Sequence, residues 1–309
     1  MPTHQLAHYS QMNLSVSPRV VAQTWRALFE ADTRKVLDGL SVRTHCDLVS
    51  DFAMPVSANA LRRITGLMNM NREQIDAASQ GMIDGISNYS GNEAVEAVCK
   101  KMTALIDRCI DEKLKTIDES TDMSLLNTLA QAGHPLDSIR ANIKLAISGG
   151  QNEPRDAIAG TAWAVLNHPA AIETVSDPDK IWRKAFEEFA RWISPIGMSP
   201  RRIAKDFHWN GINLEGGQRA FFMYGSGNRD EKVLDKPDSF DINRNNNKSI
   251  SFGAGPHFCA GASVSRCLIG DVALPLLFAR FPAMRIDGDV KFGGWAFRGP
   301  LKVPVRLQE

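Results

Sequence analysis

The stretch that most constrains this chain lies near its C-terminal end and reads Phe252-Gly-Ala-Gly-Pro-His-Phe-Cys-Ala-Gly261. It is rich in glycine and runs directly into an apolar helical segment that begins at Ala262. Gly255 allows the backbone to turn with φ > 0, and Gly261 lets the backbone approach closely. The loop therefore presents the side chain of Cys259 at the start of a helix.

A cysteine in this setting suits a haem-thiolate site. Cysteine thiolate is a haem axial ligand that pushes electron density toward the iron and favours O–O cleavage. Backbone N–H groups of the turn and of the helix N-terminus would keep the sulfur of Cys259 anionic, and Phe252 would cover the sulfur side of the macrocycle. The pattern F-x-x-G-x-x-x-C-x-G arises by chance in roughly one chain of this length in a thousand. The alternative is a buried free cysteine at a helix start, which is common for cysteine.

Three further segments support the haem interpretation. Glu188 and Arg191 are three residues apart on a predicted helix and share a face. The alternative is an ordinary solvated surface pair, because this spacing is common. Arg244 ends a turn-rich stretch just before the cysteine loop, and Arg201 opens a strand-and-turn segment that ends at Asp206.

Together these residues resemble the cytochrome P450 family in its soluble bacterial form, over essentially all 309 residues. The resemblance implies that Cys259 is the proximal haem ligand and metal ligand. It implies that a buried triad forms from Glu188, Arg191 and Arg244. It also implies contacts to the haem propionates from Arg201, His257, His4 and His8. Histidine stands where the family has the arginine of an H-x-x-x-R pattern at position 8, so that contact is expected to be weaker and pH-dependent.

The same resemblance predicts the fold class: mainly α with small β-sheets (α+β). A single domain is expected over residues 1–309, helix-rich over 1–192 and mixed α/β with the haem loop over 193–309. In the family, several helices, most of a β-sheet and a substrate-covering loop precede the propionate-facing helix. The chain is therefore expected to lack an N-terminal part, either because its start is misplaced or because it is a fragment.

Periodicity places the elements. Apolar spacing predicts helices from Val20 to about Thr116 and a long central helix from Pro135 to Leu166. Short strands are predicted over 218–224 and near 290–292 and 301–306.

The middle of the predicted central helix carries Gly149, Gly150 and Pro154. Pro154 cannot donate to the carbonyl of Gly150 and pushes it away, so the helix is expected to open at Gly150. An opened groove with a free carbonyl suits O₂ and an ordered water. A plain kink between two core helices is the alternative.

The P450 family usually has an acid and then a threonine just after this glycine. Alignment on His168-Pro169 puts Asn152 at the acid position and Glu153 at the alcohol position. The candidate catalytic residues are therefore Gly150, Asn152 and Glu153. A carboxyl group in a partly apolar pocket has a raised pKa and acts as a general acid, so Glu153 is expected to handle protons directly. The segment Gly150-Gln-Asn-Glu-Pro-Arg-Asp156 resembles that of bacterial P450 members that demethylate methoxyphenols.

Four largely apolar side chains are expected to face the substrate: Ile147, Ile196, Met198 and Phe297. They suit a small aromatic or terpene-like molecule better than a sugar or nucleotide. Ordinary core packing is the alternative for each of them.

Composition excludes other classes. The net charge is +1 with no long charge run, so nucleic acid is not implied. Five cysteines without paired spacing suit a reducing, cytoplasmic location. No apolar run is expected to approach the ~20 residues of a membrane span, and the start has no signal-peptide character.

The predicted function is a haem b monooxygenase that inserts one oxygen atom from O₂ into a small apolar substrate, which is expected to be aromatic, by hydroxylation or O-demethylation. Electrons would come from NAD(P)H through a ferredoxin and its reductase or a combined reductase. One alternative is an H₂O₂-driven peroxygenase that uses Glu153. Another is an inactive haem-binding fragment.

Overall fold

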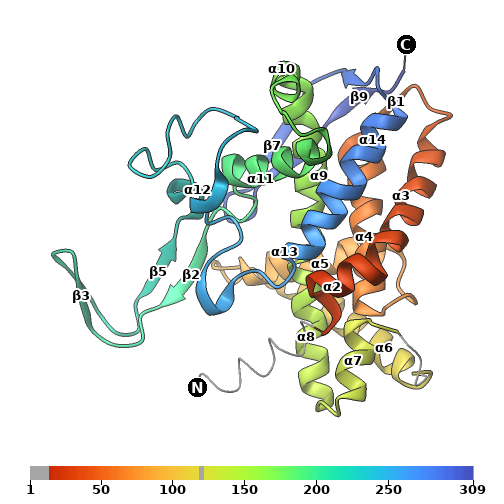
Figure 1. Cartoon of the computed structure of the whole chain (residues 1–309). Coiled ribbons are helices and arrows are strands. Elements are labelled where there is room, and N and C mark those ends of the chain that lie inside the picture. The colour runs from red at the N-terminus through yellow and green to blue at the C-terminus, as the bar shows by residue number, and fades with distance from the viewer. Residues whose placement is uncertain (1–13, 118–121, 309) are drawn as a thin grey trace.

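The computed structural model describes residues 14–117 and 122–308. The predicted contacts of His4 and His8 lie outside these residues. Helices form the main body, and a β-arm made of β2 to β5 extends away from it (Figure 1). The predicted class, mainly α with small sheets, is confirmed.

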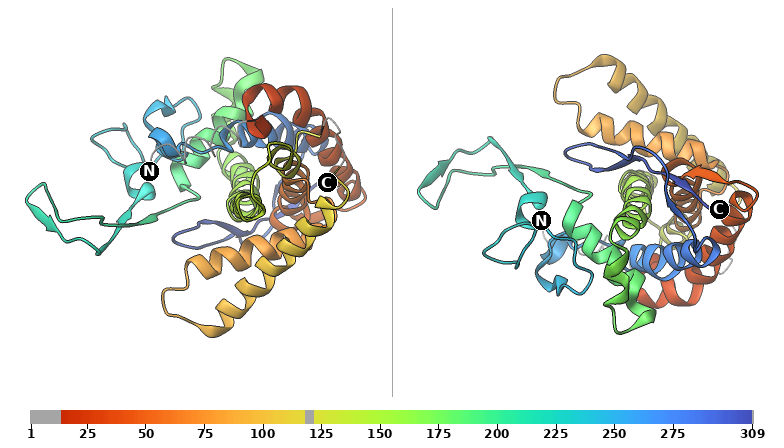
Figure 2. Two further views of the ribbon diagram at one scale, coloured as in Figure 1. Left: turned by 90° about the horizontal axis from the view of Figure 1, so that it is seen from below. Right: turned by 90° about the horizontal axis from the view of Figure 1, so that it is seen from above.

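The helices of the first part are interrupted by only one short strand among the described residues. A continuous helical segment joins α2, the π-helical η1 and α3, and a second joins η2 and α4. These elements are α2 (Pro18–Val20), η1 (Val21–Trp25), α3 (Arg26–Leu40), β1 (His45–Asp47), η2 (Leu48–Ala53), α4 (Met54–Thr65), α5 (Arg72–Ile86), α6 (Glu93–Leu114) and α7 (Leu125–Gln131). In both views of Figure 2, α5 and α6 run side by side along one flank of the body.

The predicted central helix is two helices, α8 (Leu136–Ser148) and α9 (Asn152–Asn167). The N–H of Gly150 reaches the carbonyl of Ile147 only at 3.5 Å. Pro154 lies in the first turn of α9, where a missing N–H removes no helical hydrogen bond. The expected interruption of the helix at Gly150 is therefore confirmed, a groove for O₂ there stays a prediction, and a single helix from Pro135 to Leu166 is wrong.

The second part alternates short helices with four small antiparallel sheets. The helical elements are α10 (Pro169–Glu173), η3 (Pro178–Lys180), α11 (Ile181–Ile193), α12 (Tyr224–Gly227), η4 (Asn246–Lys248), η5 (Gly255–His257), α13 (Ala262–Ser265), η6 (Arg266–Ala273) and α14 (Leu274–Arg280). The strands are β2 (Ser199–Arg202), β3 (Phe207–Trp209), β4 (Ile212–Leu214), β5 (Arg219–Phe222), β6 (Arg285–Ile286), β7 (Lys291–Gly293), β8 (Gly299–Lys302) and β9 (Pro304–Arg306).

Strand pairing joins distant parts of the chain in the main body and forms the two-stranded sheets of the arm. The sheets have the orders β1-β9-β6, β2-β5, β3-β4 and β7-β8. Pairing of His45 with Arg306 brings the beginning of the helical part to the end of the chain. The β3–β4 hairpin turns at Asn210 and Gly211, whose φ values of 50° and 80° suit a two-residue hairpin turn with both residues left-handed.

One helical run departs from expectation. Ala262–Arg280 spans 19 residues with a mean hydropathy of 1.5, so by length and composition alone it passes as a candidate membrane span, contrary to the expectation of no such run. Inside the protein, 56% of its most apolar window is buried, and it packs against α3 and α11. Its apolar character therefore serves the core, which brings the cysteine loop onto the helical body.

Candidate active site

The cysteine loop is closed by backbone hydrogen bonds. The N–H of Cys259 donates to the carbonyl of Phe252 at 2.9 Å, and the N–H of Ala262 donates to the carbonyl of Cys259 at 3.2 Å. Backbone N–H groups of Gly261 and Ala262 also point at the sulfur. Cys259 is a free, exposed cysteine. The loop thus presents one sulfur, with two donors aimed at it, at the N-terminus of α13.

Two opposing effects act on this thiol. Although Cys259 is exposed as a residue, the surrounding loop desolvates its sulfur, and this raises the pKa of Cys259 above its ordinary value. The N–H groups of Gly261 and Ala262 and the charge of Arg266 lower that pKa, while the charge of Glu153 raises it. Desolvation is the largest effect, so without a cation the thiol keeps its proton. A coordinated metal ion deprotonates such a thiol outright.

Two of the three glycines of the loop, Gly255 and Gly261, have different surroundings. Gly255 has φ +68°, as expected for a turn that favours glycine. A Cβ at Gly261 would lie 3.8 Å from the sulfur, which is ordinary contact, so the close backbone approach expected there stays a prediction. The ring of Phe252 meets the ring of Phe186 edge-on at 6.1 Å, and the guanidinium of Arg266 lies 5.0 Å from its centroid.

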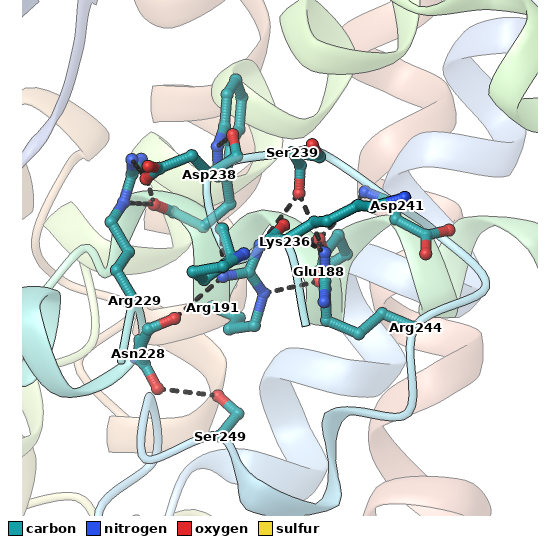
Figure 3. A network of polar contacts seen from close by, with 12 residues as sticks. Glu188, Arg191, Asn228, Arg229, Lys236, Asp238, Ser239, Asp241, Arg244 and Ser249 are labelled. Carbon is teal, nitrogen blue, oxygen red and sulfur yellow. Dashed lines mark hydrogen bonds and ion pairs between the residues drawn. The ribbon is translucent and has the colours of Figure 1, made fainter. Parts of the chain in front are cut away.

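The structure brings Glu188, Arg191 and Arg244 together in a buried cluster (Figure 3). Arg191 donates to both carboxylate oxygens of Glu188 at 2.8 Å, and neither side chain is exposed. Arg244 donates to the same carboxylate at 3.2 Å from the loop that precedes the cysteine. The N–H of Asp241 adds a further bond at 2.9 Å. The carboxylate is therefore fully paired inside the protein, as a buried charge requires.

The cluster also fixes the backbone that leads to the cysteine. Arg191 donates to the carbonyls of Asn228 and Pro237 at 2.8 Å. The buried side chain of Asn228 accepts from the N–H of Ile250 at 2.8 Å and donates to Ser251 at 3.1 Å. Asn228 therefore joins the triad to the residues just before Phe252. A lone asparagine in a turn-rich stretch gives no sequence signal for this role.

The junction of α8 and α9 contains unpartnered acceptors. A Cβ at Gly150 would lie 2.4 Å from the carbonyl oxygen of Ala146, so only glycine fits. Asn152 is buried, and its amide donates to Gln80 at 2.9 Å while its oxygen has no partner. One carboxylate oxygen of Glu153 is buried without a hydrogen-bond partner. Burial raises the pKa of Glu153 to about 7.

Sequence reasoning missed a charged group beside this junction. Arg155 of α9 donates to Asp156 at 2.9 Å and to Asp76 of α5 at 3.2 Å. Asp76 lies 79 positions before Arg155 in the chain, so no local spacing could pair them.

The expected propionate residues lie at the surface. Arg201 lies in β2, is exposed, and donates to Ser199 at 2.6 Å and to the carbonyl of Pro200 at 2.8 Å. Its guanidinium lies 5.3 Å from the ring centroid of Phe222. His257 is exposed in η5, within the cysteine loop. Among the described residues, no hydrogen bond joins Arg201 to His257.

The expected substrate residues fall in two places. Ile147 and Met198 are buried, with exposures of 0% and 4%. Ile196 pairs with Phe297 in an isolated antiparallel bridge, and both are half-buried. The bridge thus holds the segment after α11 against the turn between β7 and β8.

Comparison with known proteins decides the family. The sequence model described as "Cytochrome P450" matches residues 180–284, which contain both the triad helix and the cysteine loop. The polyketide biosynthesis cytochrome P450 PksS of Bacillus subtilis is 26% identical over 308 residues, covering 97% of this chain and 75% of that protein. Its solved structure matches with a TM-score of 0.86 at 25% identity, covering 100% of this chain and 80% of that one.

The chain belongs to the cytochrome P450 family. A second relative, the steroid C26-monooxygenase of Mycolicibacterium smegmatis, is 27% identical over 82% of this chain and 64% of its own length. The chain therefore spans about two thirds to three quarters of the length of these two relatives. Their names refer to steroids and to polyketide biosynthesis, so neither supports the likeness to aromatic O-demethylases.

The residues of this P450 fit a haem. One sulfur with two N–H donors suits a single thiolate ligand, while the unpartnered oxygens of Asn152 and Glu153 suit a polar distal side. Among the residues that the structure describes, no group of three or more His, Cys, Asp or Glu side chains could hold a metal ion by itself.

Proposed function

We propose that this P450 is a monooxygenase that converts a small apolar substrate RH, together with O₂, two electrons and two protons, into ROH and water. The observation that carries the proposal is the Cys259 loop, with its two N–H donors on the sulfur at the start of α13. Haem, when bound, would activate O₂ for insertion into a C–H bond.

The chain's own residues would hold the haem. Cys259 would supply the axial ligand, and Phe252 would cover the sulfur side. Arg201 and His257 would reach the propionates, since both are exposed donors and His257 lies within the cysteine loop. The triad would keep the loop rigid through Asn228, because its buried bonds join α11 to residues 249–251.

Glu153 would hold and deliver the protons of the reaction. A carboxyl with a pKa of about 7 is half protonated at neutral pH, which suits a general acid. Its buried oxygen has no competing partner in the protein. Asn152 would orient water at the same junction through its free oxygen, and Gly150 would leave room for both.

The substrate would be aromatic and would lie against Ile147, Ile196, Met198 and Phe297. Hydroxylation of a methoxy carbon would collapse to a phenol and formaldehyde, which gives O-demethylation. Electrons from NAD(P)H would arrive through a ferredoxin and its reductase or a combined reductase, in the cytoplasm.

A peroxygenase is the second candidate, and the unpartnered carboxylate of Glu153 favours it. Glu153 would take a proton from H₂O₂ and return it to the departing oxygen as water leaves. No external electrons are then needed, because the peroxide carries them.

One experiment separates these activities. The haem-loaded protein is supplied either with NADH, ferredoxin, reductase and ¹⁸O₂, or with unlabelled H₂O₂ alone, and the apolar methoxybenzene is the probe substrate. Substrate-dependent NADH oxidation with one ¹⁸O in the formaldehyde is the expected result. Turnover with H₂O₂ alone would identify the peroxygenase. Haem binding without either turnover would contradict both and leave the inactive fragment.

A further inference from the structure

A second buried carboxyl group lies one helical turn beyond Glu153 on α9. Asp156 is 7% exposed. A Cβ at Gly299 of β8 would lie 2.4 Å from the Cβ of Asp156 and 2.6 Å from its Oδ2, so the strand backbone rests directly on this side chain. Residues three apart on a helix share a face, so Glu153 and Asp156 are neighbours along α9.

An arginine connects this buried carboxyl to the protein surface. The Nε of Arg155 donates to Asp156 Oδ1 at 2.9 Å, and its Nη1 donates to Asp76 Oδ1 at 3.2 Å. Gln151 also donates to Asp76, at 3.0 Å. The side chain of Asp76 is 29% exposed, against 10% for that of Asp156. A line of charged groups therefore leads from solvent at α5 to the interior of α9.

The two carboxyl groups on α9 hold their protons over the same pH range. Burial is the main cause that raises the pKa of Asp156 to about 6 and that of Glu153 to about 7. The charge of Asp156 raises the pKa of Glu153, and that of Arg155 lowers both. The other charged groups that face the pair are Asp76 of α5 and the Cys259 thiol. Groups of similar pKa exchange a proton in either direction without a large energetic step.

We propose that Asp156 resupplies Glu153 with protons from solvent, and that Arg155 positions Asp156 for this by holding it between α9 and Asp76. The inference rests on the proposed role of Glu153. Each turnover consumes two protons, so Glu153 must be reprotonated after it donates one. The Asp156 carboxyl then passes its proton to the Glu153 carboxylate and takes another from water at the Asp76 side. Each transfer breaks one O–H bond and forms one, and no electrons move.

Asp156→Asn in the haem-loaded full chain tests the relay. The readout besides activity is the infrared signal of the protonated Glu153 carboxyl, assigned by its loss in Glu153→Gln and followed against pH. Removal of a neighbouring like charge should lower the midpoint of this signal by ~1 pH unit. The protonated fraction at pH 7 then falls about 5-fold, from roughly one half to one tenth, and NADH-driven product formation should fall by about the same factor.

Arg155→Gln should shift the midpoint of the Glu153 signal in the opposite direction. A general loss of folding could not produce opposite shifts in the two variants. Without the arginine charge, the midpoint of Glu153 should rise by ~1 pH unit. Glu73→Gln removes an exposed acid from the same helix as Asp76 and should leave the midpoint unchanged. A midpoint that stays fixed, or that moves the same way in both variants, would overturn the relay.

Failure of the relay can be told apart from failure of the proposed role of Glu153. If Glu153→Gln lowers NADH-driven product formation but Asp156→Asn leaves the Glu153 midpoint unchanged, only the relay is wrong. If Glu153→Gln leaves product formation unchanged, the proposed role of Glu153 is wrong and the relay falls with it.

Discussion

Replacement of Arg191 by alanine should strongly destabilise the protein. The guanidinium is fully buried and makes five hydrogen bonds: two to Glu188 and one each to the carbonyls of Asn228, Pro237 and Ser239. Its loss leaves Glu188 buried with only Arg244 and the N–H of Asp241 as partners.

The expected loss of unfolding free energy is about 3–5 kcal/mol, because breaking a buried ion pair leaves an uncompensated charge. Since Arg244 still faces Glu188, the unpaired charge alone should lower the free energy of unfolding by an amount in the lower half of this range. The three orphaned carbonyls move the total back toward its upper half. At this chain length ~1 kcal/mol corresponds to ~2 °C in Tm, so the melting temperature should fall by ~6–10 °C.

Thermal unfolding and haem content measure the effect together. Arg183→Ala is the matched control, since Arg183 lies on the same helix and pairs with Asp271, but its side chain is 46% exposed. An exposed pair contributes ~0–1 kcal/mol, so this variant should melt within ~2 °C of the parent. Equal melting temperatures and haem contents for the two variants would refute the reasoning that the triad supports the cysteine loop.

Three further predictions concern the α8–α9 junction. Gly150→Ala should lower the free energy of unfolding in urea by ~1–3 kcal/mol, because the added methyl group would lie 2.4 Å from a carbonyl oxygen. The control Gly149→Ala, whose added methyl group would have its nearest atom at 3.6 Å, should stay within ~0.5 kcal/mol of the parent. Equal losses in the two variants would contradict the close packing at Gly150. Between the ordinary pKa of 4.5 and the folded pKa of about 7, the folded protein keeps the Glu153 proton that the unfolded chain releases, so stability should fall as pH rises through this window, by up to ~3 kcal/mol. Glu153→Gln should flatten that part of the curve, and an unchanged slope would refute the assignment. Glu153→Thr should lower H₂O₂-driven turnover by about 10²-fold, with a smaller loss with NADH because a hydroxyl still holds a water, and equal peroxide activity would show that Glu153 is passive.

Local sequence signals predicted the cysteine loop and the helix break well, whereas the triad followed from the family resemblance, because Glu188 and Arg244 lie 56 positions apart. The loop follows from glycines at positions that need φ > 0 and from the helix that begins at Ala262. The break follows from Gly150 and Pro154, since both disfavour a continuous helix. The loop and the break depend on residues close together in sequence, where spacing alone fixes the geometry.

Features that depend on distant segments could not be predicted. The pairing of Arg155 with Asp76 needs α5 to pack beside α9, and charges on solvated helices look the same as these in sequence. The link from Asn228 to Ser251 has the same origin. The expectation of no long apolar run also went wrong, because the buried helix 262–280 is as apolar as a membrane span.

The central claim is that Cys259 binds the iron of a haem. The most direct measurement is the absorption spectrum of the reduced, CO-bound protein, for the parent, Cys259→Ser and the control Cys99→Ser, whose half-buried thiol lies on α6 away from the loop. We expect the long-wavelength band of thiolate-ligated iron in the parent and in Cys99→Ser, and its loss in Cys259→Ser. Persistence of that band in Cys259→Ser would show that Cys259 is not the iron ligand.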